Sequence, residues 1–100
     1  MTSQWTWFTV RLALVGLSET RAPKVIQDLR QQLAMRPHLR NPRVEWDSKT
    51  SRAIVQIDTE DKDPMQAAKQ MQEEMLEALA AVLWETEGLR FEILDARPTL

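Results

Sequence analysis

The chain has 100 residues, of which 43% are hydrophobic and 28% charged, and its formal net charge is −2. These values fit one domain of ordinary globular composition, and the small charge gives no overall attraction to nucleic acid or to an anionic membrane. The sequence contains no cysteine, which excludes disulfides, thiolate zinc sites and cysteine nucleophiles. Because no targeting segment or membrane-spanning apolar run is visible, we expect a single cytoplasmic domain over residues 1–100 with no membrane partner.

Residues 5–16 predict a first strand with two different faces. Side chains alternate along a strand with a period of two, so one row can form a core: Phe8, Val10, Leu12 and Leu14. The other row mixes aromatic, charged and small residues: Trp5, Trp7, Thr9, Arg11, Ala13 and Val15. What covers this second row is the functional question that the sequence raises.

A first helix is predicted from about Thr20 to Met35. Apolar residues recur there at helical spacing, and Pro37 requires an end near Met35 because the residue before a proline avoids the helical region. Two short alternating segments follow, around residues 43–46 and 52–57. The polar stretch of residues 47–50 between them predicts a hairpin with a loop of about four residues.

The second helix has the clearest start in the sequence, since Asp63 is a good N-cap, Pro64 suits the first helical position and Gln66 the third. We expect this helix to reach Glu87 and to end at Gly88. Its expected apolar stripe comprises Met65, Ala68, Met71 or Gln72, Met75, Leu76, Leu79, Ala80 and Leu83. A last strand follows, in which Leu89, Phe91 and Ile93 alternate with Arg90, Glu92 and Leu94.

The resulting order, strand-helix-strand-strand-helix-strand, resembles the ferredoxin-like split βαβ fold of the α+β class. Right-handed crossovers then predict a four-stranded antiparallel sheet in the order fourth, first, third, second strand, with both helices on one face. The resemblance lies in the element pattern alone. It carries no function by itself, because this fold serves many unrelated activities.

The helix-free face of that sheet is the main candidate site. Apolar side chains among arginines are typical of a contact surface, and aromatic residues and arginine are enriched at interfaces. The candidate interaction residues are Trp5, Trp7, Arg11, Arg52, Ile54, Arg90 and Leu94. A solvated face with cross-strand charge pairs is the plainer interpretation.

Single-stranded RNA binding is an alternative, with bases stacking on Trp7 and the arginines of the same face contacting phosphates. The segment from Ser51 to Asp58, SRAIVQID, does not resemble the aromatic-rich motif of RNA-binding domains, and the third strand offers no second aromatic residue. Nucleic acid is therefore a weaker candidate partner than a protein.

Two charged segments are candidate ligand sites. Residues 36–43, RPHLRNPR, could bind an anion through Arg36, His38, Arg40 and Arg43, or could form a solvated loop stiffened by two prolines. Residues 58–63 carry four carboxylates, but the glycine that a calcium loop requires is missing. We therefore expect no metal and no cofactor.

No motif of a known catalytic class is present, so we expect no enzyme activity. The sequence favours a non-catalytic interaction or regulatory module that forms a homodimer or other homo-oligomer, or binds another protein, through the open sheet face or a sheet edge. At the level of fold it resembles ACT-type regulatory domains, which associate and bind small ligands at their interfaces. A small-molecule-binding domain of that kind, or a small dimeric enzyme, is the third alternative.

Overall fold

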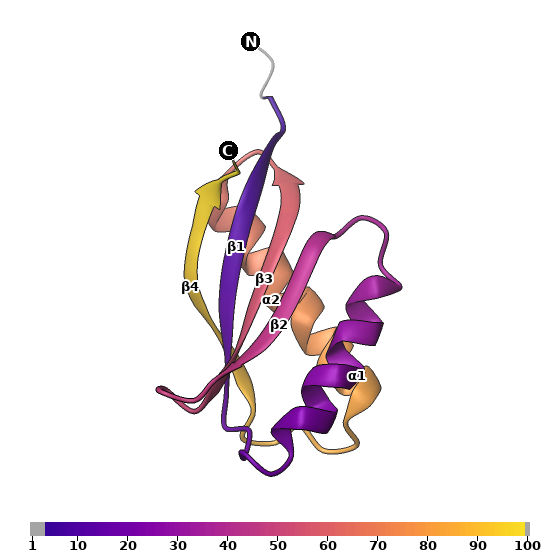
Figure 1. Cartoon of the computed structure of the whole chain (residues 1–100). Helices are drawn as coiled ribbons and strands as arrows, with labels where there is room; N and C mark the ends of the chain where they lie inside the picture. Colours follow the sequence, from indigo (N-terminus) through magenta and orange to yellow (C-terminus); the bar gives the residue numbers. More distant parts are fainter. Residues whose placement is uncertain (1–3, 100) are drawn as a thin grey trace.

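A computed structural model describes residues 4–99. The elements are β1 (Thr6–Val15), α1 (Ala22–Ala34), β2 (Arg40–Asp47), β3 (Arg52–Asp61), α2 (Pro64–Val82) and β4 (Arg90–Pro98). All three strand pairings are antiparallel, and the sheet order is β2-β3-β1-β4 (Figure 1). The expected α+β class, element order and strand order are confirmed, and the order is compatible with a ferredoxin-like fold.

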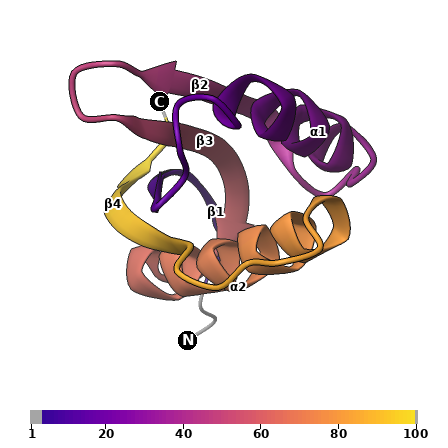
Figure 2. The same ribbon diagram turned by 90° about the horizontal axis from the view of Figure 1, so that it is seen from below.

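Both helices lie on the same side of the curved sheet (Figure 2). Helix α2 packs against β4, β1 and β3, whereas α1 packs against β2 and against α2. The inner row of β1 lies at the centre of this core, with no side chain more than 4% exposed: Phe8, Val10, Leu12 and Leu14. Burial of this row and of the two helix stripes is the main stabilising term of the fold.

Helix α1 differs by one or two residues at each end from the predicted helix. It begins at Ala22 with Pro23 in its first turn, and the side chain of the N-cap residue Arg21 makes no capping hydrogen bond. It ends at Ala34, ahead of Pro37.

No helix of the described residues is both long enough and apolar enough to cross a membrane.

The start of α2 is confirmed, and its predicted end is wrong. A carboxylate oxygen of Asp63 accepts a hydrogen bond of 3.3 Å from the Gln66 N–H. The helix ends at Val82 because Leu83 turns to an extended conformation, where its partly buried side chain packs against the core. Further helical turns would also place Glu85 and Glu87 at the negative end of the helix dipole.

The buried stripe of α2 is rotated relative to the prediction. Met65 is 59% exposed and Leu76 42% exposed, although both were expected in the core. The buried residues are Ala67, Ala68, Met71, Met75, Ala78 and Leu79. Alanines in this stripe lack bulky side chains, so α2 can lie close to the sheet, whereas Met65 and Leu76 face outward.

The predicted hairpin is confirmed. Asp47 pairs with Arg52 as the last pair of β2 and β3, which leaves a four-residue loop. The Asp47 carboxylate accepts hydrogen bonds from the Lys49 N–H at 3.1 Å and from the Thr50 hydroxyl at 2.7 Å. The loop closes on Ser51 with a positive φ of 54°.

Candidate interaction face of the sheet

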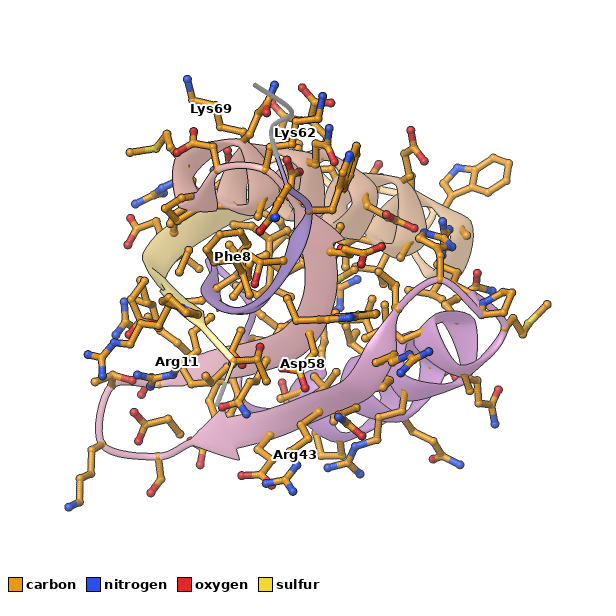
Figure 3. The ribbon with its side chains drawn as sticks, turned by 90° about the horizontal axis from the view of Figure 1, so that it is seen from above. Phe8, Arg11, Arg43, Asp58, Lys62 and Lys69 are labelled. Carbon is orange, nitrogen blue, oxygen red and sulfur yellow. The ribbon has the colours of Figure 1, made fainter. Side chains whose placement is uncertain are left out.

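The face of the sheet that no helix covers, hereafter the open face, consists of alternate residues of all four strands. Figure 3 shows Phe8 on the side of the sheet toward α2, whereas Arg11 and Arg43 point away from that helix. The strand register assigns to the open face Arg40, Arg43, Glu45 and Asp47 of β2, Arg52, Ile54, Gln56, Asp58 and Glu60 of β3, Trp7, Thr9, Arg11, Ala13 and Val15 of β1, and Arg90, Glu92, Asp95 and Arg97 of β4.

The six arginines in this set are balanced by six carboxylates. A charge-neutral face exerts no net attraction on a polyanion such as RNA. Recognition on this face therefore depends on where the individual charges lie.

A β-bulge changes what β4 contributes to the open face. Arg11 pairs with Asp95 and Leu12 with Ile93, so Leu94 is the extra residue between them. The strict alternation expected through Leu94 ends there, and Asp95 rather than Leu94 lies opposite Arg11. A bulge arises from the packing of the whole sheet, and the alternating sequence of residues 89–94 carries no sign of it.

Ion pairs occupy the side of the open face formed by β1 and β4. Arg11 Nη1 lies 3.2 Å from Asp95 Oδ2, and Arg97 Nη2 lies 3.8 Å from the same oxygen. Arg90 Nη2 lies 3.1 Å from Glu92 Oε1. The side chains of these pairs range from 24% to 78% exposed, so each pair contributes about 1 kcal/mol or less to stability.

One further ion pair spans the sheet across β1. Arg52 Nη1 on β3 lies 3.7 Å from Glu92 Oε2 on β4, although these strands are not neighbours. Ala13, which lies between them and pairs with both Ile54 and Glu92, is completely buried. A small side chain on β1 thus allows the longer ones on either side to meet above it.

The side of the open face along β2 is different, because its two central charges lack ion-pair partners among the described residues. Arg43 and Glu45 lie opposite the uncharged Gln56 and Ile54, and neither forms an ion pair within residues 4–99. Both line an open depression of about 350 Å³ together with Arg11, Trp46, Asp47, Ile54 and Gln56. Here the open face presents unpaired charges of both signs around an aliphatic side chain.

A polar row crosses the open face between the start of β1 and the end of β3. Asp58 accepts hydrogen bonds from the Thr9 hydroxyl at 2.7 Å and from the Asn41 amide at 2.8 Å. Asn41 lies at the bulge of β2 with a positive φ of 51°, which asparagine tolerates better than most residues. The Arg40 guanidinium stands 4.6 Å from the centre of the Trp7 ring and occupies one face of that ring.

Two residues of the predicted interaction set lie at its margins. Trp5 precedes β1, is 56% exposed and carries Lys62 at 5.5 Å over its ring. Leu94, in the bulge, is partly buried. The others, Trp7, Arg11, Arg52, Ile54 and Arg90, share the open face as expected.

Comparison with protein-family models, with curated proteins and with solved structures finds no match to this chain. Its function therefore has to be argued from the open face and the surfaces around it.

Of the four residues of the candidate anion site, Arg36, His38 and Arg40 gather around Glu74, whereas Arg43 lies apart. Arg36 Nη1 and His38 Nε2 both contact the Glu74 carboxylate of α2, at 3.3 Å and 2.5 Å. Arg40 stacks on Trp7, and Arg43 faces the depression along β2. Glu74, which the sequence reasoning did not single out, is only 16% exposed and supplies a negative charge where an anion would need positive charge.

The acidic run of residues 58–63 is divided among local structural roles. Asp58 belongs to the polar row described above, Asp61 accepts a hydrogen bond from the Lys62 N–H, and Asp63 caps α2. Among the described residues no group of three histidine, aspartate or glutamate side chains is placed to hold a metal ion.

Asp95, Arg97 and Glu74 are charged residues of these contacts that the sequence reasoning missed. The signal for Asp95 was faint. It lies between the apolar residues Leu94 and Ala96, next to Arg97, and is one position out of phase with the polar–apolar alternation of residues 89–94. Glu74 had no local signal, because its partners come from a different segment of the chain.

Proposed function

We propose that this chain is a ferredoxin-like, non-catalytic interaction module that associates with a second copy of itself through the open face. The observation that carries the proposal is the uncovered side along β2, where Arg43 and Glu45 flank the aliphatic Ile54 without ion-pair partners in residues 4–99. Charges of both signs on one surface are what a self-complementary contact needs, and two-fold homodimers are the commonest soluble assemblies.

The size of the open face supports this use. Strands of 8 to 10 residues at about 3.3 Å per residue, spaced about 4.8 Å apart, give a projected area of roughly 600 Å². A standard interface buries about 800 Å² of accessible surface on each partner. Because a face covered with side chains has more accessible surface than its projection, nearly complete coverage of the open face would supply a stable contact.

The sheet edges are less suitable for self-association. Arg30 of α1 donates two hydrogen bonds, of 2.9 and 2.6 Å, to the Val44 carbonyl of β2. Gln72 of α2 donates one of 2.6 Å to the Phe91 carbonyl of β4. Both edge strands also contain a proline, which blocks continuous pairing. Of the two routes that the sequence allowed, we therefore favour the open face over an edge.

The RNA-binding alternative has less support. A stacked base would have to displace Arg40 from Trp7 or use the other face of that ring, and the charges of the open face cancel. For an ACT-like ligand site, the depression along β2 is the nearest equivalent, and it is open to solvent on one side.

Light scattering across the micromolar range tests the proposal. We expect the wild-type chain to approach twice the mass of one copy, and Ile54→Lys, on the open face, to return it to the mass of one. Leu76→Lys, on the exposed side of α2, is the matched control and should leave the dimer intact. A wild-type chain that stays at the mass of one copy, or a dimer lost in Leu76→Lys but kept in Ile54→Lys, overturns the proposal.

A further inference from the structure

The charges of β2 on the open face are segregated along the strand. Arg40 and Arg43 occupy one half, and Glu45 and Asp47 occupy the other. The register places all four on the open face, opposite Asp58, Gln56, Ile54 and Arg52 of β3. From the start to the end of β2, the side chains on the open face therefore carry positive charge first and negative charge second.

The two central charged residues of β2 are less engaged in contacts within their own chain than the two outer ones. Arg40 is engaged with the Trp7 ring, and the Asp47 carboxylate holds the hairpin loop. Arg43 and Glu45 have no ion pair among residues 4–99 and both line the depression along β2. In a single copy, the guanidinium of Arg43 and the carboxylate of Glu45 therefore face water instead of an opposite charge.

We propose that two copies pack open face to open face about a two-fold axis perpendicular to the strands, with β2 of one copy antiparallel to β2 of the other. This orientation rests on the proposed self-association and specifies its geometry. The axis passes near Val44, so that Arg43 of each copy meets Glu45 of the other. Arg40 of each copy then lies near Asp47 of the other.

Two-fold symmetry explains why the pattern has this form. In an isologous contact, residue i of one copy meets residue j of the other and the reverse contact occurs as well, so each charge pair is formed twice. A strand with its positive half before its negative half satisfies this condition when it is reversed upon itself. A parallel arrangement of the β2 strands would place like charges together and would be disfavoured. On β4 the same axis brings Glu92 of one copy near Asp95 of the other, and each of these carboxylates is already paired with an arginine of its own chain, Arg90 or Arg11.

Packing by faces rather than by edges follows from the contacts of β2. An edge-to-edge pairing of two β2 strands would present the same charge sequence, but it needs the outward carbonyl of Val44. That carbonyl already accepts both hydrogen bonds from Arg30, and Pro42 nearby has no N–H to donate. The side chains of Arg43 and Glu45 remain available on the open face.

Charge reversal provides a sharp test because each variant changes both copies at once. Arg43→Glu gives a surface with two carboxylates, and Glu45→Arg gives one with two guanidinium groups. Each alone should weaken the homodimer about tenfold or more, since both symmetric pairs become repulsive. Mixing the two single variants should form a heterodimer, and the double variant Arg43→Glu/Glu45→Arg should regain the homodimer.

Sedimentation equilibrium of the full chain at low salt is the measurement, with Lys69→Glu on α2 as a charge-reversal control that should leave association unchanged. Circular dichroism confirms that each variant is folded. If the wild type dimerises but both single variants keep its dissociation constant, the antiparallel β2 orientation is overturned. The same holds if mixing the two variants restores no dimer. Either result leaves the proposed function standing. A wild-type chain that stays monomeric overturns both.

Discussion

The only two glycines of the chain, Gly16 and Gly88, meet backbone to backbone where the β1–α1 loop passes the α2–β4 loop. A Cβ atom on Gly16 would overlap the carbonyl oxygen of Gly88, whereas a Cβ on Gly88 would meet nothing within 4 Å. Both residues have a positive φ, 99° and 81°, which side chains disfavour. The contact joins the end of β1 to the loop that leads into β4.

This asymmetry predicts unequal costs for the same substitution at the two positions. Gly16→Ala has to strain the backbone and displace the second loop, so it should lower the free energy of unfolding by at least about 2 kcal/mol. Gly88→Ala incurs only the conformational strain, about 1 kcal/mol. Urea denaturation of the two variants checks the difference, and equal losses would contradict a close approach of the loops.

The role of Gly88 also marks the limit of what the sequence could predict. A glycine after a helical pattern favours a helix stop, and the sequence analysis placed the end of the second helix there. The helix ends at Val82 instead, because Leu83 leaves it to pack against the core. Gly88 is needed instead for its positive φ of 81°, and its carbonyl oxygen requires glycine at position 16, some 70 residues away, which no local pattern reveals.

The strands and their order were predictable because period-two alternation and right-handed crossovers are strong constraints. On the open face, the positions of Trp7, Arg11, Ile54 and Arg90 followed from that alternation. The partner of Arg11 did not, since the bulge at Leu94 shifts the register of β4. Pairings that depend on a bulge or on a helix packed nearby cannot be predicted from single segments of the sequence.

A second prediction concerns the hairpin loop. Ser51 has a φ of 54°, a left-handed conformation that costs about 1 kcal/mol for a residue with a Cβ. Ser51→Gly should therefore raise the free energy of unfolding by several tenths of a kcal/mol, after the larger entropy of the unfolded glycine is subtracted. Ser48→Gly in the same loop, where φ is not positive, should give a loss instead. Thermal unfolding of the two variants measures both signs.

A third prediction concerns the acid titration of the same loop. The hydrogen bond from the Thr50 hydroxyl, followed by that from the Lys49 N–H, lowers the pKa of Asp47 below its usual value of 3.8. Because the folded pKa is depressed, the associated stability is present above the unfolded pKa and is lost as the pH falls through the folded one. Thr50→Val should raise the pKa of Asp47 part of the way back to 3.8, since the backbone bond remains.

Carboxyl carbon chemical shifts followed by NMR between about pH 2 and pH 6 report this titration directly. Ser48→Ala, which alters the loop without removing a described hydrogen bond to Asp47, is the control and should leave the pKa where it is. An unchanged Asp47 titration in Thr50→Val would show that the hydroxyl does not hold the carboxylate in solution.

A fourth prediction separates two tryptophans. Trp46 packs against the core at the end of β2, whereas Trp84, just after α2, is fully exposed. Trp46→Ala should lower the free energy of unfolding by about 2 to 3 kcal/mol, and Trp84→Ala should change it by less than about 0.5 kcal/mol. Acrylamide should correspondingly quench the fluorescence of Trp84 far more than that of Trp46, measured in two variants that each retain only that one of the four tryptophans.

The last prediction concerns the protected edges of the sheet. Arg30→Met keeps most of the apolar stem but removes both hydrogen bonds to the Val44 carbonyl, which should cost about 1.5 kcal/mol or more because the donor is charged. The freed carbonyl also exposes β2 to pairing with other chains, so this variant should form larger species on concentration. Gln31→Met, on the exposed surface of the same helix, adds a similar apolar side chain without touching the edge. Size-exclusion chromatography distinguishes the two, and equal aggregation of both variants would mean that added surface hydrophobicity, rather than an opened edge, is responsible.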